Sequence, residues 1–186
     1  MSWISRLKID HAARHLWQGG IIAYPTEAVF GLGCDPMNQE AVEYISSIKG
    51  RSANKSFIVI AAGFDQIEPL LAPLTDEHKN TLTQSWPGPI TWIVPAAKTT
   101  PAWLTSTDQT IAVRVSDHPI VRALCLAFGG PLISTSANPS GYPPARTALK
   151  VRSYFKNESI LIVHGRLGEQ SKPSAIYDLK SGTRLR

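Results

Sequence analysis

The stretch GGIIAYPTEAVFGLG, residues 19–33, decides the fold expected for this chain. Its first two glycines predict the end of a helix over 10–18. The apolar run 21–24 has the length and composition of a short buried strand, and Pro25 ends that strand because proline cannot donate to a sheet ladder. A helix followed at once by a buried strand is a building unit of an α/β domain.

Polar side chains come directly after that strand. Thr26 and Glu27 stand where a strand of an α/β sheet opens onto its ligand crevice, and Gly31 and Gly33 would let another group approach the backbone closely. An ordinary strand–turn connection accounts for the proline and the glycines, but not for a hydroxyl and a carboxylate at this position. We therefore expect the segment to contribute to a binding site.

The same alternation of helices and strands continues along the chain. Capping residues, apolar spacing and Gly or Pro boundaries predict helices over 38–49, 75–85, 117–128 and 147–155, and strands over 57–61, 90–94, 110–115, 131–134, 160–163 and 175–179. No repeat, low-complexity tract or linker interrupts them. These elements predict one α/β domain over residues 1–186, a twisted mixed sheet flanked by helices.

Composition narrows the class of protein. Apolar residues make up 43% of the chain, enough for a continuous core, and its two cysteines, Cys34 and Cys125, form no CxxC or metal-binding pattern. The most apolar runs, 57–64 and 90–97, are far shorter than the roughly 20 residues of a membrane span. We expect a reduced, cytoplasmic protein without a targeting segment or membrane contact.

Positive charge gathers towards the C-terminus of a chain with a formal net charge of +5. Residues 145–186 hold nine lysines and arginines against three acidic residues. This asymmetry suits an anionic partner such as nucleotide phosphates or RNA, and equally an ordinary solvated basic surface.

Several familiar chemistries have no motif in this sequence. It contains no GxxxxGK[ST] phosphate loop, no GxGxxG fingerprint, no HExxH or GxSxG motif and no zinc-deaminase signature. The histidines four residues apart, His11 and His15, are expected on a polar helix face rather than at a metal. An enzyme with this sequence would not rely on a phosphate loop, a protein nucleophile with a histidine base, or a structural zinc.

Three cations fall within the seven residues 49–55. Lys49, at a helix end, is accounted for by the helix dipole, whereas Arg51 and Lys55 are less easily explained in that way. Cations on the rigid lip of a strand suit a polyphosphate.

Arg114 lies inside the otherwise apolar strand 110–115, on the same face as Ala112. A buried arginine needs a partner, which would be either an internal carboxylate or the carboxylate of a ligand. The spacing leaves both open.

Small hydroxyl and amide side chains gather in 134–141, just past the strand expected over 131–134. Such a turn can present backbone N–H groups and side-chain donors to an anion or a nucleotide base. An ordinary Ser/Thr turn is the alternative. The coincidence with the three other segments favours a binding site.

The chain resembles the YrdC-type threonylcarbamoyl-AMP synthases in five motifs that occur in the same order. These are PTEAVFGLG at 25–33, KGR at 49–51 followed by Lys55, WPGP at 86–89, AVRVSDHP at 112–119 and STSAN at 134–138. The resemblance runs from about Gly19 to Arg186 and corresponds to the short bacterial form of the family. It implies a twisted mixed α/β sheet with a basic concave face.

The resemblance implies a nucleotidyltransferase that joins L-threonine, bicarbonate and ATP into threonylcarbamoyl-AMP and releases pyrophosphate, with Mg²⁺ accompanying ATP. A tRNA-modifying transferase complex would then pass the threonylcarbamoyl group to the adenosine next to the anticodon, in tRNAs reading codons that begin with A. Direct contact with tRNA would suit the basic C-terminal part. Because the threonine amine would capture bicarbonate or CO₂ and the carbamate would attack ATP, no protein nucleophile is needed.

The resemblance also implies roles for individual residues. The implied threonine contacts are Thr26, Arg114, Ser134 and Ser174, with Arg114 holding the carboxylate. The implied ATP contacts are Lys49, Arg51, Lys55, Thr110, Ser136, Asn138, Arg146 and Arg186. Among them, Lys49 and Arg51 form a catalytic KxR pair that would stabilise charge at the phosphates. No protein ligand to a metal is implied.

The chain departs from its longer relatives at two positions. They carry a histidine where this chain has Ile60, so that contact is absent or differently supplied. They carry an asparagine where this chain has Lys55, so Lys55 would bind phosphate more directly.

Two other functions compete with this interpretation. A non-catalytic RNA-binding factor in ribosome or rRNA maturation would explain the basic C-terminal part, but not Thr26, Arg114 and the STSAN turn together, and no RNA-recognition aromatic signature is present. A sugar-phosphate enzyme would need an acidic metal cluster, for which Glu27 and Asp35 are the candidates.

Overall fold

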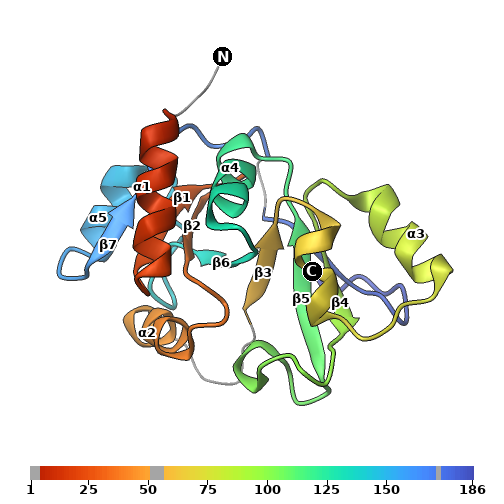
Figure 1. The fold of residues 1–186 in the computed structure, drawn as a ribbon. Helices are drawn as coiled ribbons and strands as arrows, with labels where there is room; N and C mark the ends of the chain where they lie inside the picture. Colours follow the sequence, from red (N-terminus) through yellow and green to blue (C-terminus); the bar gives the residue numbers. More distant parts are fainter. Residues whose placement is uncertain (1–4, 51–56, 171–172) are drawn as a thin grey trace.

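The computed structural model describes residues 5–50, 57–170 and 173–186, whose strands form one mixed sheet (Figure 1). The strands are β1 (Ile21–Pro25), β2 (Phe30–Gly33), β3 (Ile58–Ala61), β4 (Ile90–Pro95), β5 (Thr110–Val115), β6 (Leu132–Ser136), β7 (Ile160–Ile162) and β8 (Ala175–Asp178). Their order across the sheet is β7-β1-β2-β6-β3-β5-β4-β8. The pairs β1–β7, β3–β5 and β4–β8 are parallel, and the other neighbours are antiparallel. The predicted α/β class with a mixed sheet is confirmed.

Helices and short 3₁₀ turns pack against this sheet. They are α1 (Arg6–Trp17), α2 (Gln39–Lys49), α3 (Asp76–Ser85), α4 (Pro119–Phe128), α5 (Ala148–Tyr154), η1 (Phe64–Gln66), η2 (Glu68–Leu70) and η3 (Ala102–Leu104). α2 forms where the sequence predicts it. The Asn38 side chain accepts a hydrogen bond from the Ala41 N–H at 3.1 Å, and Gly50 ends the helix in the left-handed region at φ 57°.

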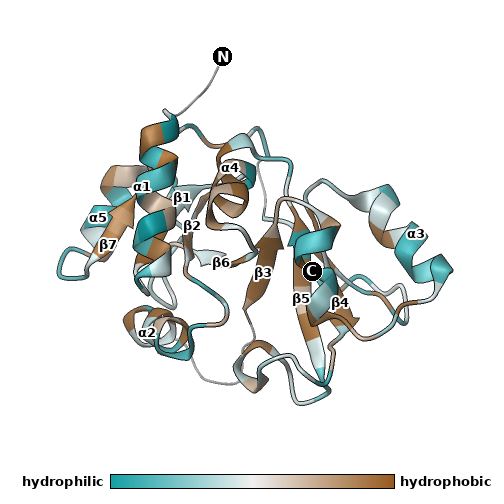
Figure 2. Cartoon of the chain, in the orientation of Figure 1, coloured by the Kyte–Doolittle hydropathy of each residue, from teal (hydrophilic) through white to brown (hydrophobic). Residues whose placement is uncertain are grey.

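The buried side chains form two hydrophobic clusters. In the first, α1 and α4 pack on one face of the sheet, against Ile22, Tyr24, Ile60 and Leu132. The second gathers alternate strand residues such as Val59, Val113 and Ile133 together with side chains from α2, α3 and α5. In Figure 2, β3 and β5 are largely apolar, whereas the visible surfaces of α1 and α3 are largely hydrophilic. The sheet is therefore the centre of the core.

Three local expectations need correction. β2 was not predicted, because glycine is unfavourable in strands, although Phe30 and Leu32 alternate with the two glycines and are buried. The helix expected from 117 begins at Pro119, and Asp117 does not cap it: His118 is the N-cap, and proline suits the first helical position because its missing N–H would have no partner there. β6 extends beyond 134 to Ser136, because its last two residues pair with β2.

Among the described residues, none of the helices combines the length and the apolar character that crossing a membrane requires.

Candidate functional site

A cavity of about 500 Å³ opens on the sheet face that α1 and α4 cover elsewhere. The pairing register places on this one face residues from six strands, and they form much of the cavity floor. They are Gly31, Ile58, Ile93, Ala112, Arg114, Ser134, Ser136 and Ile176. The position of Arg114 on the same face as Ala112 was predicted from the sequence and is confirmed.

The cavity begins where the helices no longer cover this face of the sheet. Under α4 the face carries Ile60 and Leu132, both fully buried. Two residues further along the same strands, Ile58 and Ser134 face the cavity instead. Ile60, where longer relatives would have a histidine, therefore lies in the core beneath the helix.

Two glycines of β2 serve different purposes. A Cβ on Gly33 would lie 2.5 Å from the Ile133 carbonyl oxygen and 2.7 Å from the Tyr24 ring, so this position must stay bare for the aromatic ring to pack. A Cβ on Gly31 would meet its nearest neighbour, Thr26 Cγ2, at 3.4 Å, which is an ordinary contact. The absence of a side chain at Gly31 therefore enlarges the cavity rather than relieving a clash.

A buried ion pair stands at the edge of this floor. Arg114 Nη2 donates to Glu27 Oε2 at 2.6 Å, and Ser116 Oγ donates to Glu27 Oε1 at 2.6 Å. Arg114 and Glu27 both line the cavity and are 7% and 6% exposed. Of the two partners open to Arg114 from the sequence, the structure supplies the internal carboxylate while leaving the arginine facing the cavity.

The hydroxyls expected around a small substrate are placed on two sides of the cavity. Thr26 Oγ1 donates to the Val29 carbonyl at 2.8 Å, which fixes the loop after β1. Ser174 Oγ lies 2.9 Å from Thr91 Oγ1, and both residues are buried. Thr26, Ser134 and Ser174 all line the cavity together with Arg114.

The turn after β6 is held from beneath by Lys49. Lys49 Nζ donates to the carbonyls of Ser136 and Asn138, the latter at 2.7 Å, and the lysine is only 4% exposed. The N–H groups of Ala137, Asn138 and Ser140 bond to internal carbonyls. The expected nest of N–H donors is thus not formed by these residues, because the fold already uses them.

Asn138, in the same turn, has a hydrogen-bond acceptor that the protein does not use among its described residues. Its Nδ2 donates to the carbonyls of Pro139 and Tyr142, at 3.0 and 2.7 Å, whereas its Oδ1 is buried with no hydrogen-bond partner among the described residues. Neither Asn138 nor Lys49 contributes to the cavity lining, although Ser136 does.

Of the remaining residues predicted to bind substrate, some line the cavity and others do not. Arg186 lines the cavity, and its Nη2 donates to the Ser174 carbonyl at 3.1 Å; burial, and secondarily the charge of Arg114, lower its pKa. Thr110 starts β5, with its Oγ1 2.8 Å from Ser106 Oγ, and does not line the cavity. Arg146 is exposed outside the cavity. Arg51 and Lys55 lie outside the described residues.

A segment that the sequence did not point to packs against the backbone of Thr26 and Glu27. The N–H groups of Gly168 and Gln170 donate to the carbonyls of Thr26 and Glu27, at 3.0 and 3.1 Å. A Cβ on Gly168 would lie 2.8 Å from Glu27 Cα, so only glycine allows this approach. Ser116, which anchors Glu27, was likewise missed. The signals were the glycine at 168 and the hydroxyl two residues after Arg114.

His118 joins this segment to the start of α4. Its Nε2 lies 3.2 Å from the Arg166 carbonyl, and its Nδ1 is buried with no hydrogen-bond partner in the described part of the chain. Burial lowers the pKa of this imidazole although the nearby Glu27 opposes the shift.

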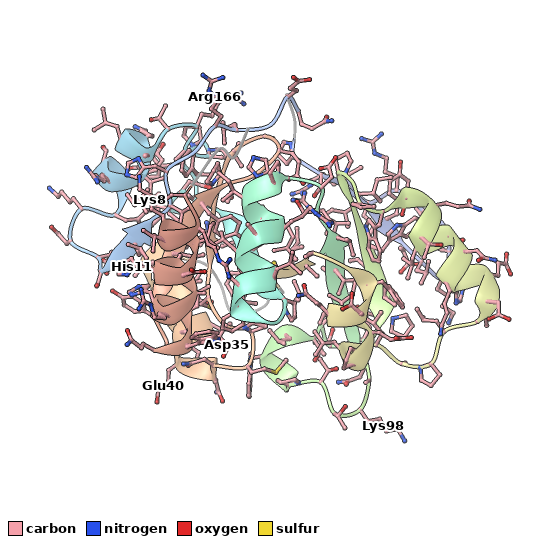
Figure 3. The ribbon with its side chains drawn as sticks, turned by 45° about the horizontal axis from the view of Figure 1, so that its top comes forward. Lys8, His11, Asp35, Glu40, Lys98 and Arg166 are labelled. Carbon is pink, nitrogen blue, oxygen red and sulfur yellow. The ribbon has the colours of Figure 1, made fainter. Side chains whose placement is uncertain are left out.

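No metal-binding cluster of three or more histidine, cysteine or acidic side chains occurs among the residues that the structure describes. His11 is exposed on the outer side of α1 (Figure 3), while His15 Nε2 lies 3.2 Å from the Ile21 carbonyl. Asp35 lines a different surface hollow from Glu27, so the two carboxylates do not line one site together.

Comparison with known proteins identifies relatives across the whole chain. The family profile Sua5_yciO_yrdC, described as "Telomere recombination", matches residues 14–186. The threonylcarbamoyl-AMP synthase of Halorhodospira halophila is 50% identical over 179 residues, which cover 96% of this chain and 94% of that protein. The enzyme of the same name from Cellvibrio japonicus is 44% identical over 186 residues, covering 100% and 98%.

Solved structures agree with the fold. P. abyssi Sua5 in complex with L-threonine superposes with a TM-score of 0.88 at 32% identity, covering 95% of this chain and 52% of that one. E. coli YciO superposes with a TM-score of 0.87 at 25% identity, covering 98% and 89%.

The two glycines of β2 should respond differently to the same substitution. Gly33→Ala should lower the free energy of unfolding by about 1–3 kcal/mol, because its Cβ collides with backbone and ring atoms. Gly31→Ala should stay within about 0.5 kcal/mol of the wild type. Urea unfolding of both variants tests this, and equal destabilisation would contradict the assignment of Gly31 to the cavity floor.

Arg114→Met should destabilise the chain by about 3–5 kcal/mol, because it leaves the Glu27 carboxylate buried without its cation. Lys79→Met is the matched control, since the Lys79–Glu68 pair at 3.3 Å is about half exposed and worth at most about 1 kcal/mol. Urea unfolding at neutral pH measures both. A similar small loss for the two variants would show that the buried pair contributes little.

His118 should make the fold sensitive to acid. Because its pKa is lowered in the folded chain, the unfolded chain takes up the proton first, and stability falls as pH drops below the ordinary histidine range. His118→Gln should lose less stability than the wild type between neutral pH and about pH 5. Urea unfolding at several pH values gives the two slopes; parallel slopes would contradict the prediction.

Proposed function

Because the chain belongs to the Sua5–YciO–YrdC family, we propose that it joins L-threonine, bicarbonate and ATP into threonylcarbamoyl-AMP and releases pyrophosphate. The chain is an enzyme, a transferase like its relatives. The observation that supports this reaction best is the Arg114 guanidinium at the edge of a cavity lined by hydroxyls. That cavity, about 500 Å³, is within the ~300–1,000 Å³ range of small-molecule sites.

In this proposal threonine binds over β5 and the loop after β1. Arg114 holds the substrate carboxylate with guanidinium donors that Glu27 does not use; one of them, Nε, has no partner among the residues that the structure describes. Thr26, Ser134 and Ser174 supply hydroxyls around the amino acid. These residues come from separate parts of the sequence and line one cavity, which is what a compact polar substrate needs.

ATP binds towards the turn after β6. Ser136 lines the cavity there, and Asn138, whose buried Oδ1 has no hydrogen-bond partner among the described residues, lies two residues further along the same turn. Arg186 adds a cation from the other side. Lys49, Arg51 and Lys55 supply charge for the phosphates, and Thr110 and Arg146 are more peripheral contacts.

The reaction then needs positioning and charge stabilisation rather than a protein nucleophile. The threonine amine captures CO₂ derived from bicarbonate to form a carbamate, with loss of a proton. A carbamate oxygen attacks the α-phosphorus of ATP and pyrophosphate leaves. The cations at the phosphates stabilise the charge that develops on the leaving group.

Mg²⁺ accompanies ATP in this proposal. Glu27, the carboxylate in the cavity lining, already accepts from Arg114 and Ser116. The ion would therefore be held chiefly by phosphate oxygens and water, as suits a cation that keeps much of its hydration shell.

We place the product in tRNA modification in the cytoplasm. A transferase complex would consume threonylcarbamoyl-AMP and modify the adenosine next to the anticodon, in tRNAs reading codons that begin with A. The exposed basic residues of the C-terminal part, such as Arg146 and Arg152, would suit direct contact with tRNA.

Purified protein should release pyrophosphate from ATP only when threonine and bicarbonate are both present. Gly31→Ala should lower this activity, since the added methyl group enters the cavity without a clash in the fold. A coupled pyrophosphate assay with each substrate omitted in turn is the measurement. Equal release without threonine or without bicarbonate would remove the synthase function, and RNA binding without turnover would favour the non-catalytic alternative.

A further inference from the structure

Glu27 is the acidic residue among the buried side chains of the described chain, and the proposed chemistry gives it no task. Its two carboxylate oxygens have different partners. Oε2 accepts from Arg114 Nη2 and Oε1 accepts from Ser116 Oγ, each at 2.6 Å. Glu27 therefore connects the cavity arginine to a fully buried hydroxyl at the end of β5.

The two oxygens of Glu27 thus bind two different residues, which is unusual for a carboxylate that only neutralises an arginine. A carboxylate that serves only to neutralise arginine commonly faces the guanidinium with both oxygens and forms two parallel hydrogen bonds. Here Glu27 engages one nitrogen of Arg114, and Arg114 Nε is buried without a hydrogen-bond partner among the described residues. Because buried donors in native proteins are nearly always paired with protein, water or ligand, this guanidinium has donor capacity left for a water or for a ligand carboxylate in the cavity that it lines.

Glu27 is itself fixed more firmly than Arg114. Ser116 Oγ, which donates to Glu27, also accepts from the His118 N–H at 3.1 Å. The Glu27 carbonyl accepts from the Gln170 N–H, and Gly168 packs directly on the Glu27 backbone. Because both its side chain and its backbone are held, Glu27 has a fixed position. Its hydrogen bond restrains the longer side chain of Arg114.

We propose that Glu27 is a positioning residue that orients the Arg114 guanidinium towards the carboxylate of the amino-acid substrate. The inference rests on the proposed function, which places a substrate carboxylate on Arg114. Ser116 supports Glu27 in the same task. Since Glu27 balances the charge of Arg114, recognition depends on how the remaining N–H donors are directed rather than on net positive charge.

The test compares threonine and ATP affinities of the wild type, Glu27→Gln and Ser116→Ala by calorimetry, with urea unfolding alongside. Glu27→Gln keeps the size of the side chain but weakens the charge-assisted bond, so threonine affinity should fall on the order of 10- to 100-fold. ATP affinity, and turnover at saturating threonine, should change by less than about threefold. Ser116→Ala should act in the same direction by a smaller factor.

Thr100→Val is the matched control. It removes a buried hydroxyl that donates to the Leu70 carbonyl at 2.7 Å, outside the cavity lining. It should lower stability without changing threonine affinity. In an Arg114→Lys background, Glu27→Gln should add little further loss of threonine affinity, because the guanidinium that Glu27 orients is gone.

Each outcome decides the proposal. Wild-type threonine affinity in Glu27→Gln, or equal losses of threonine and ATP affinity, would overturn the positioning role while leaving the proposed function standing. Additive losses in the Arg114→Lys background would also overturn it. If Glu27→Gln does not fold, Ser116→Ala decides by the same criteria. A wild-type chain that binds no threonine would overturn the proposed function and this inference with it.

Discussion

The contact between the Glu27 carboxylate and the Arg114 guanidinium joins parts of the sheet that a flat arrangement would keep apart. Glu27 follows β1, and Arg114 belongs to β5, four places away in the strand order. Four strand spacings amount to about 19 Å in a flat sheet, more than two side chains can bridge. The 2.6 Å contact therefore requires that the sheet curve, that the loop after β1 fold over it, or both. Glu27 and Arg114 both line the cavity, so the ion pair is part of its wall.

The hollow stays open because of the residues that follow the core along each strand. On β6 the large apolar Leu132 lies under α4, whereas the next same-facing residue, the small and polar Ser134, faces the cavity; Gly31 and Ala112 on neighbouring strands are also small. A face with large side chains throughout would fill the hollow and bury Arg114 against apolar atoms. The same strands thus contribute core residues beneath α1 and α4 and cavity residues beyond these helices.

The sequence was most informative where the signal is local. The Asn38 cap, the left-handed Gly50 and the helices they bound could be predicted because a cap and its helix are neighbours in the chain. The facing of Arg114 could be predicted because alternation along a strand is also local. The identity of its partner could not, since Glu27 is 87 residues away and only the tertiary fold brings the two together. β2 escaped prediction because two of its four residues are glycines, which are unfavourable in strands.

Lys49 shows how a role implied by resemblance is refined by geometry. The resemblance places it at the phosphates, and the structure places its Nζ on the carbonyls of Ser136 and Asn138, almost fully buried beneath the turn. A lysine ammonium in that position fixes the turn. Its positive charge also raises the electrostatic potential at the turn, where the proposed nucleotide would bind. Asn138, whose buried Oδ1 has no hydrogen-bond partner among the described residues, is held by the same bonds. A buried cation can therefore serve a nucleotide site in two ways at once, by shaping the backbone that carries the recognition groups and by adding charge in a region where water does not screen it.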